Sequence, residues 1–294
     1  MDPVKVGTAI RTLRSSAGYT QHQLADFMGV TDKAVSKWER GLSVPDVSIV
    51  TKLSVLLNVD VDNLLEGNIA YLEQAWQGYL ILDAKDEVFC GSEAYGKPLV
   101  YFYLSYFMLA GIGEIYISCP EQDKKWIDDR IGDGSRYGIQ LIHGRPENSM
   151  NTMVVYNDPF VYGPNLTKYF QRAMSRMNGI SVLTVAKNIG GSEIKISYDK
   201  YKAVQEPEDS AIGQFCVPIL FFPKKFFDQI SNVSLIKHLQ PLYAEPMSNG
   251  MIEYSITDED SLLETASFLR YMKKRMGKDI YELTEVAKNR HFIE

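Results

Sequence analysis

The sequence predicts two domains of different fold class, an all-α helix-turn-helix bundle followed by a larger α/β domain. In the first part of the chain, apolar residues recur at the three- and four-residue spacing of helices. From Gly78 onward, short β-rich runs alternate with segments of helical length. We therefore assign residues 1–68 to the bundle, 69–77 to a linker and 78–294 to the α/β domain. A chain of 294 residues is long enough for two domains at ~100–200 residues each.

The first short helix of the bundle is predicted from its capping residues. Thr20 followed by Gln23 forms a capping box, which predicts a helix that starts at Gln21. Its apolar face comprises Leu24, Ala25 and Met28. Gly29 ends the helix, because the tight turn that follows requires a positive φ, which a side chain would resist.

The next helix presents a polar outer face. Thr31 is its predicted N-cap, and Val35 and Trp38 point inward at helical spacing. The residues left facing outward are Asp32, Lys33, Ser36, Lys37 and Arg40. The second helix of such a pair lies in the DNA major groove with its N-terminal residues at base edges. The pattern therefore predicts a double-stranded DNA operator as the partner.

Each polar side chain has a predicted DNA contact. We expect Lys33 and Lys37 to donate to guanine O6 and N7, and Asp32 to accept from a cytosine amino group. Phosphate contacts are expected from Gln21, Thr31, Ser36 and Arg40. The alternative is a plain helical bundle whose polar face is only solvated.

The N-terminal pattern resembles the Cro/C1-type (Xre) helix-turn-helix family over residues 5–67. The resemblance includes the run Ser36-Lys-Trp-Glu-x-Gly41. It implies an internal ion pair between Arg14 and Glu39. It also implies a fourth helix that starts at Pro45-Asp46 and carries Val50, Leu53, Leu56 and Leu57, with Leu64 and Leu65 closing the bundle.

Composition restricts the partners of the chain. A net charge of −6 argues against indiscriminate coating of nucleic acid and favours a local DNA-binding surface. Acidic and basic residues roughly balance in the first domain, so we expect affinity to depend on dimerisation, as a homodimer or higher homo-oligomer. The apolar stretch 99–112 is shorter than the ~18–20 residues that span a bilayer, and no signal peptide is recognised. We expect a cytoplasmic bacterial protein with no membrane partner, whose three cysteines are buried hydrophobic residues.

The second domain has the pattern of an α/β sheet. Predicted strands lie at 79–82, 114–118, 138–142, 153–156 and 180–186. Predicted helices lie at 99–110, 121–131, 166–177 and 261–276. Alternation of this kind predicts a mixed, mainly parallel sheet of Rossmann type.

Several motifs of the second domain resemble the glucose-1-phosphate thymidylyltransferase family. They include Tyr95-Gly-Lys97-Pro98-Leu-Val-Tyr-Phe, Ile131-Gly-Asp133-Gly-Ser135, and the run from Val154 to Leu166 that contains Asp158. The resemblance implies transfer of a nucleotide to a sugar 1-phosphate by a Gly-rich phosphate loop, lysines and two magnesium-binding aspartates. Each of these groups neutralises charge around a transferring phosphoryl group.

The sequence departs from that family at its charged groups. The phosphate loop is replaced by the shorter, acidic 82–87, which would repel a triphosphate. The family's lysines fall on Phe89 and within Gln205-Glu206-Pro207, and its second aspartate falls on Ser255. The base-recognition segment is shortened to 144–152. We therefore assign no catalytic residue and expect a pseudoenzyme domain.

Asp158 and Lys97 are the remaining candidate ligand-binding residues. Asp158 is either a retained magnesium or ligand carboxylate or a capping residue at a loop, and no cofactor beyond possible magnesium is indicated. Lys97-Pro98 either contacts a phosphate or starts a helix, and 132–135 is either a structural turn or a ligand clamp. Together the domains predict a transcriptional regulator that dimerises and senses a sugar phosphate, nucleotide or nucleotide sugar. The alternatives are an active nucleotidyltransferase with an accessory DNA-binding module, and a platform that binds an active relative.

Overall fold

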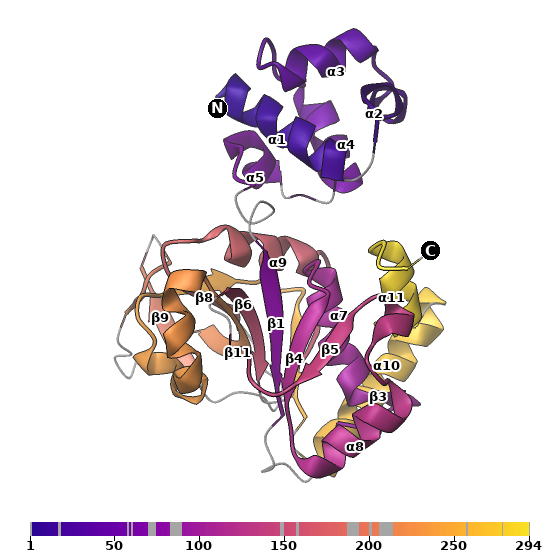
Figure 1. Cartoon of the computed structure of the whole chain (residues 1–294), viewed down its shortest axis with the longest axis vertical. Helices are drawn as coiled ribbons and strands as arrows, with labels where there is room; N and C mark the ends of the chain where they lie inside the picture. Colours follow the sequence, from indigo (N-terminus) through magenta and orange to yellow (C-terminus); the bar gives the residue numbers. More distant parts are fainter. Residues whose placement is uncertain are drawn as a thin grey trace. The chain divides into compact units, whose positions relative to one another are not determined.

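The computed structural model divides into two compact units, 1–74 and 75–294 (Figure 1). It describes every residue except 1, 17–18, 58, 60, 70–74, 83–89, 148–149, 157–158, 187–193, 200–201, 206–213, 257, 278 and 294. Within the described ranges, no helix combines the length and the apolar composition needed to cross a membrane.

The first unit is an all-α bundle, as predicted. Its helices are α1 (Pro3–Ser16), α2 (Gln21–Met28), α3 (Asp32–Glu39), α4 (Val47–Leu56) and α5 (Val61–Glu66). The capping box at Thr20 is present, Thr31 caps α3, and Gly29 has a φ of 69°. The core is built from apolar faces of all five helices and includes Val6, Ile10, Leu24, Val35, Trp38, Leu53 and Leu64. The predicted helix-turn-helix is therefore confirmed.

The backbones of α1 and the end of α3 meet at Gly7. An added Cβ at Gly7 would collide with the carbonyl oxygen of Trp38 and lie 3.0 Å from the amide nitrogen of Gly41. Both of these obstacles are backbone atoms, which have no alternative rotamer. Glycine at this position allows the two helices to approach closely.

Replacing Gly7 by alanine is expected to destabilise the first unit by ~1–3 kcal/mol, because a collision with backbone forces the helices apart. Helix propensity alone would act in the opposite direction, stabilising by ~1 kcal/mol. Urea unfolding of the full chain, followed by circular dichroism, distinguishes the two signs. Arg11→Ala, at an exposed position of α1, is the matched control. An unchanged or raised midpoint for Gly7→Ala would contradict the close approach.

The second unit contains a mixed nine-stranded sheet in the order β10-β9-β11-β6-β1-β4-β5, with β8 paired to β11 and β12 paired to β8. Its strands are β1 (Trp76–Ile81), β4 (Glu114–Ser118), β5 (Gln140–His143), β6 (Asn151–Tyr156), β8 (Ile180–Val185), β9 (Lys195–Tyr198), β10 (Val204–Gln205), β11 (Gln214–Phe222) and β12 (Leu242–Pro246). The strands β6-β1-β4-β5 form a continuous parallel core, whereas β11 runs antiparallel to β6 and β8. The predicted α/β class is confirmed.

Two two-stranded sheets and the helices complete this unit. The sheets pair β7 (Pro159–Tyr162) with β13 (Ile252–Ser255), and β2 (Glu93–Ala94) with β3 (Lys97–Pro98). The helices are α7 (Leu99–Leu109), α8 (Glu121–Arg130), α9 (Leu166–Ser175), α10 (Glu259–Met276) and α11 (Leu283–Asn289), with 3-10 segments η1 (Ser135–Tyr137) and η2 (Lys224–His238). Helix α7 is apolar along its length and packs Phe102, Tyr103, Tyr106 and Phe107 into the core.

Two features differ from the sequence prediction. Strand β1 begins at Trp76, inside the segment we expected to be linker, because Gln77 is buried and donates from Nε2 to Thr152 Oγ1 at 3.0 Å. Strand β11 was not predicted, although it lies in the middle of the sheet. It contains Pro218, which lacks a backbone donor, and the pairing with β8 shifts register between Val217 and Leu220. This irregularity accommodates proline in an otherwise continuous central strand.

Candidate functional sites

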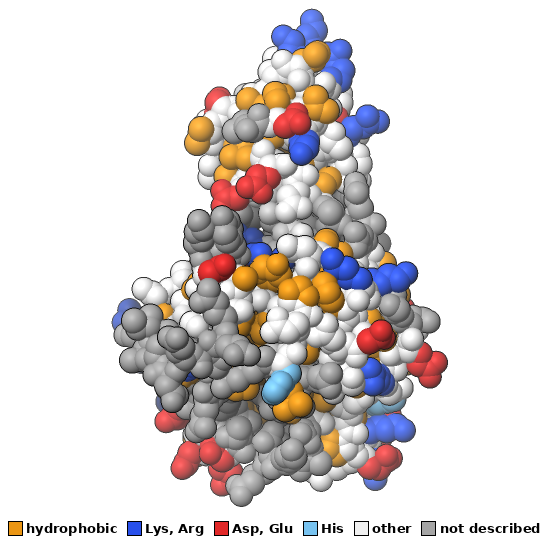
Figure 2. Space-filling model, turned by 90° about the vertical axis from the view of Figure 1, so that its left-hand side faces the viewer, with side chains coloured by type: hydrophobic (Ala, Val, Ile, Leu, Met, Phe, Trp, Pro, Cys, Tyr) orange, Lys and Arg blue, Asp and Glu red, His pale blue; other side chains and the backbone are white. Residues whose placement is uncertain are grey.

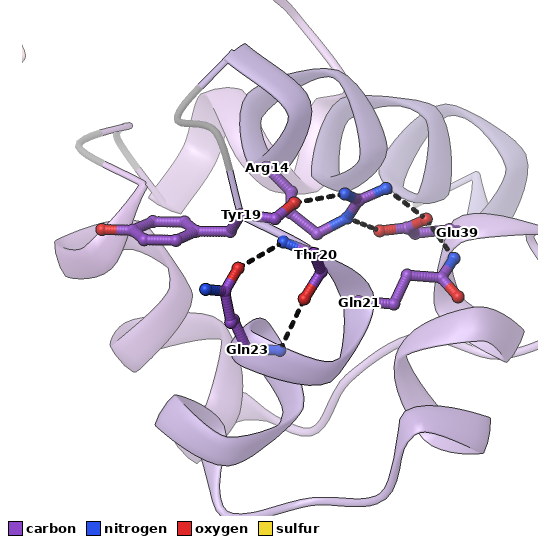
Figure 3. Close-up of polar contacts among 6 residues, drawn as sticks. All are labelled: Arg14, Tyr19, Thr20, Gln21, Gln23 and Glu39. Carbon is purple, nitrogen blue, oxygen red and sulfur yellow. Dashed lines mark hydrogen bonds and ion pairs between the residues drawn. The ribbon is translucent and has the colours of Figure 1, made fainter.

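An ion pair joins α1 to the end of α3 in the first unit (Figure 3). Arg14 donates from Nε to Glu39 Oε1 at 2.6 Å and from Nη2 to Oε2 at 3.2 Å. The two side chains are only 13% and 3% exposed, so the pair is almost free of solvent. Gln21 adds a third donor, from Nε2 to Glu39 Oε2 at 2.7 Å. The predicted Arg14–Glu39 pair is present, and it positions α3 against both α1 and α2.

The outer face of α3 carries exposed cations. Lys33, Lys37 and Arg40 are exposed, and Lys33 and Lys37 lie one helical turn apart on the same face. Figure 2 shows Lys and Arg side chains gathered at the end of the helical unit where Figure 1 places α3. Among the described residues, neither lysine forms an ion pair. Arg40 folds back along its own helix, donating from Nε to the carbonyl oxygen of Ser36 at 3.2 Å.

Two of the predicted DNA-contacting side chains already have partners within the unit. Asp32 lies against His22, whose Nδ1 is 3.1 Å from Oδ1 of the carboxylate. Gln21 uses one amide N–H on Glu39, which leaves its second N–H for a phosphate. The exposed Thr31 and half-buried Ser36 lie on the same side of the motif as Lys33. All seven contacts remain predictions.

His22 is a titratable group that sequence analysis did not identify. It lies on α2 with Asp32 at 3.1 Å and with Nε2 3.6 Å from Asp26 Oδ2. Its hydrogen bond to Asp32, followed by attraction to Asp26 and Asp32, raises its pKa above the ordinary value. The imidazole is thus more readily protonated in the folded unit than in the unfolded chain.

We expect DNA affinity to fall as pH rises above ~6.5, the ordinary imidazole pKa, and through the raised pKa of His22. The protonated ring adds a positive charge close to α3. The same protonation stabilises the fold fully below the unfolded pKa, and this stabilisation is lost as pH rises through the folded pKa. The affinity change should be less than about tenfold, because the pair is exposed and screened.

Fluorescence anisotropy with a labelled duplex, measured between pH 6 and pH 8.5 at constant ionic strength, tests this pH dependence. His22→Gln should flatten the profile. The remote His238→Gln, in η2, is the control and should leave the profile unchanged. A profile that is as steep in His22→Gln as in the natural protein would exclude His22 as its source.

In the second unit, Lys97 makes internal contacts. Its Nζ donates to the carbonyl oxygen of Ile280 at 2.7 Å and lies 3.6 Å from Asp279 Oδ1. Burial is the main cause that lowers the pKa of Lys97. Pro98 is the N-cap of α7, so Lys97-Pro98 does start a helix. Asp158, the predicted metal ligand, lies outside the described residues, as do 83–89 and Glu206-Pro207.

The glycine-rich run 132–135 forms a turn that packs within its own unit. Asp133 Oδ1 accepts a hydrogen bond from the backbone N–H of Ser135 at 3.0 Å. Gly138, just after η1, has a φ of 71° and lies so close to Phe292 that an added Cβ would collide with its carbonyl oxygen. These contacts account for the turn as part of the packing.

A buried carboxylate on β12 was also missed by sequence analysis. Glu245 is 1% exposed, and Lys202 Nζ lies 3.2 Å from its Oε2. Arg172 Nη1 and Arg176 Nη2 lie at 4.0 Å and 3.9 Å from its two oxygens. These residues come from α9, the start of the β10 hairpin and β12. No local spacing could have predicted the cluster, because its members are far apart in sequence.

Comparison with known proteins identifies the first unit. A helix-turn-helix family model matches residues 10–64. A prophage-derived HTH-type transcriptional regulator of Bacillus subtilis, YonR, is 35% identical over 103 residues, which are 33% of this chain and 92% of that protein. The chain belongs to the HTH-type transcriptional regulators. The Arg14–Glu39 pair and the exposed face of α3 lie within the matched part of this regulator.

The second unit of the regulator is similar to nucleotidyltransferases. A glucose-1-phosphate thymidylyltransferase of Neisseria gonorrhoeae is 22% identical over 227 residues, which are 66% of this chain and 79% of that enzyme. A solved Bacillus anthracis protein designated a glucose-1-phosphate thymidylyltransferase superposes with a TM-score of 0.55 at 12% identity. It covers 67% of this chain and 96% of its own. The regulator therefore joins a helix-turn-helix unit to a nucleotidyltransferase-like unit.

Proposed function

We propose that the regulator binds a double-stranded DNA operator through α3 and dimerises through its second unit, which has lost catalysis and senses a small ligand. The ligand class is a sugar phosphate, a nucleotide or a nucleotide sugar. The observation that carries the DNA-binding part is the pair of exposed lysines, Lys33 and Lys37, on a helix held in place by the buried Arg14–Glu39 pair.

The loss of catalysis is supported by the charges that the chain carries. Transfer of a nucleotide requires cations around the reacting phosphates. The segment 82–87 instead contains Asp83, Asp86 and Glu87. Lys97 is occupied by the Ile280 carbonyl and Asp279. A triphosphate would meet repulsion where a nucleotidyltransferase supplies attraction.

Dimerisation and sensing would act together. A dimer presents two recognition helices to operator half-sites that lie about one DNA turn apart, ~34–36 Å. A ligand that prefers one arrangement of the two units changes operator affinity by thermodynamic linkage. The proposal requires that ligand and operator each change the affinity of the other.

A thermal-unfolding panel tests the sensing part. The full chain is heated with magnesium, nucleoside triphosphates, sugar 1-phosphates or nucleotide sugars. A ligand that binds only the folded state adds ~2.7 kcal/mol at a hundredfold excess over its Kd. Operator binding is then measured with and without each stabilising ligand. We expect at least one ligand to do both, whereas a flat panel would overturn sensing and leave DNA binding intact.

Pyrophosphate release tests the loss of catalysis. The chain is incubated with magnesium, each nucleoside triphosphate and sugar 1-phosphates, and released pyrophosphate is measured. We expect none above the level seen without protein. Release that Asp158→Ala abolishes would overturn the proposal in favour of an active nucleotidyltransferase with an accessory DNA-binding module.

A further inference from the structure

Helix α10 of the second unit has an exposed stripe centred on Ser267. Its inner face buries Thr265 and Leu269. On the opposite side, Leu263 is 64% exposed and Tyr271 is 54% exposed. Ser267 lies midway between them, four residues from each, so all three share one face of the helix. Large apolar side chains exposed on one helical face indicate a surface that contacts another molecule.

The charges of α10 are arranged symmetrically about Ser267 but with opposite sign. Glu264 is three residues before it and Arg270 is three residues after it. Asp260 is seven residues before it and Lys274 is seven residues after it. All four side chains are exposed, and none of them forms an ion pair within the described part of the chain.

The helix macrodipole accounts for only part of this arrangement. It favours acidic residues in the first turn and basic residues in the last turn. Glu264 and Arg270 lie in the middle of the 18-residue helix, where that effect has decayed. The dipole also gives no reason for exposing Leu263 and Tyr271.

We propose that α10 of one chain packs antiparallel on α10 of a second copy, with the two-fold axis at Ser267. A two-fold axis brings the residue at a given distance before Ser267 onto the residue at the same distance after it. Leu263 then packs on Tyr271 of the second copy, Glu264 pairs with Arg270, and Asp260 pairs with Lys274. Ser267 is small enough to let the two helices approach closely. This inference rests on the proposed dimerisation and names the surface that produces it.

Within one chain the same residues have no such relation. Glu264 and Arg270 are six residues apart, which places them on different sides of the helix, so they are not neighbours. Lys273 belongs to another face and pairs with Asp279 at 3.0 Å. Only an antiparallel pair of helices brings Glu264 and Arg270 together, and this allows the proposal to be tested by charge reversal.

The test measures the dimer dissociation constant of the full chain by sedimentation velocity over a range of concentrations. Arg270→Glu should raise this constant at least about tenfold, because it places two like charges opposite each other twice in the dimer. Glu264→Arg should have the same effect. The double variant E264R/R270E should restore the constant to within about threefold of the natural protein, because the pairs re-form with reversed sign. Circular dichroism melting curves verify that each variant is folded.

A cross-linking experiment tests the position of the axis. Ser267→Cys should give a disulfide-linked dimer under mild oxidation, because the two cysteines face each other across the axis within disulfide reach. Leu235→Cys, at a position that is 54% exposed in η2, is the control and should stay monomeric in a non-reducing gel. The three native cysteines are free, and Cys90 and Cys216 are buried.

The outcomes separate this inference from the proposed function. A dimer whose dissociation constant is unchanged by either single variant, or not restored by the double variant, overturns the α10 interface and leaves dimerisation through another surface. A natural protein that is monomeric at all concentrations overturns the dimerisation itself. Operator binding and the ligand panel, measured separately, are unaffected by either result.

Discussion

Replacing Glu39 by alanine is expected to unfold most of the N-terminal unit and abolish operator binding. The substitution leaves the guanidinium of Arg14, whose side chain is 13% exposed, without its carboxylate. Breaking a buried pair by removing one partner costs ~3–5 kcal/mol. A domain of this size is stable by only ~4–10 kcal/mol. Gln21 also loses its acceptor, so the contact between α2 and α3 weakens with the ion pair.

The measurement is a urea titration of the full chain, followed by circular dichroism, together with operator binding by anisotropy. Removing both partners, as Arg14→Met with Glu39→Met, should recover much of the loss, because no unpaired buried charge remains. Glu66→Ala, at an exposed position of α5, is the matched control. A Glu39→Ala protein as stable as the natural one would contradict the role assigned to the pair.

Replacing Lys37 or Lys33 by alanine is expected to weaken specific operator binding by ~1–3 kcal/mol each, or about 5–150-fold. Each substitution removes a donor from the exposed face of α3 without touching the core, so the fold should be unchanged. A residue that contacts a base also sets the preference at that base pair. Loss of discrimination at one position therefore distinguishes a base contact from a general loss of charge.

Anisotropy measured at fixed salt on the operator and on its single base-pair variants tests both lysines. Lys52→Ala, at an exposed position of α4, removes the same charge away from α3 and is the control. A lysine variant that weakens all duplexes uniformly would show that its side chain contacts phosphate. Unchanged affinity in both lysine variants would overturn the assignment of α3 as the recognition helix.

The sequence by itself determined the features that depend on local geometry. Thr20, Gln23 and Gly29 act within a few residues of their own positions, so the capping box and the turn were predicted together with the start of α2. The periodicity of apolar residues likewise predicted the class of each unit. The charge pattern of α10 can be found by inspection, because it involves a single helix. These features repeat at short spacing, and a sequence records short spacings directly.

Only the tertiary structure decided which side chains have partners. His22 meets Asp32, and Lys97 meets the backbone of Ile280, 183 residues away in sequence. Strand β11 was hidden by Pro218, since a proline argues against a central strand until the neighbouring register shift is known. The exposure of Leu263 and Tyr271 was also visible only in the fold. Such features depend on which distant segments pack together, and packing is a property of the whole chain that no local spacing contains.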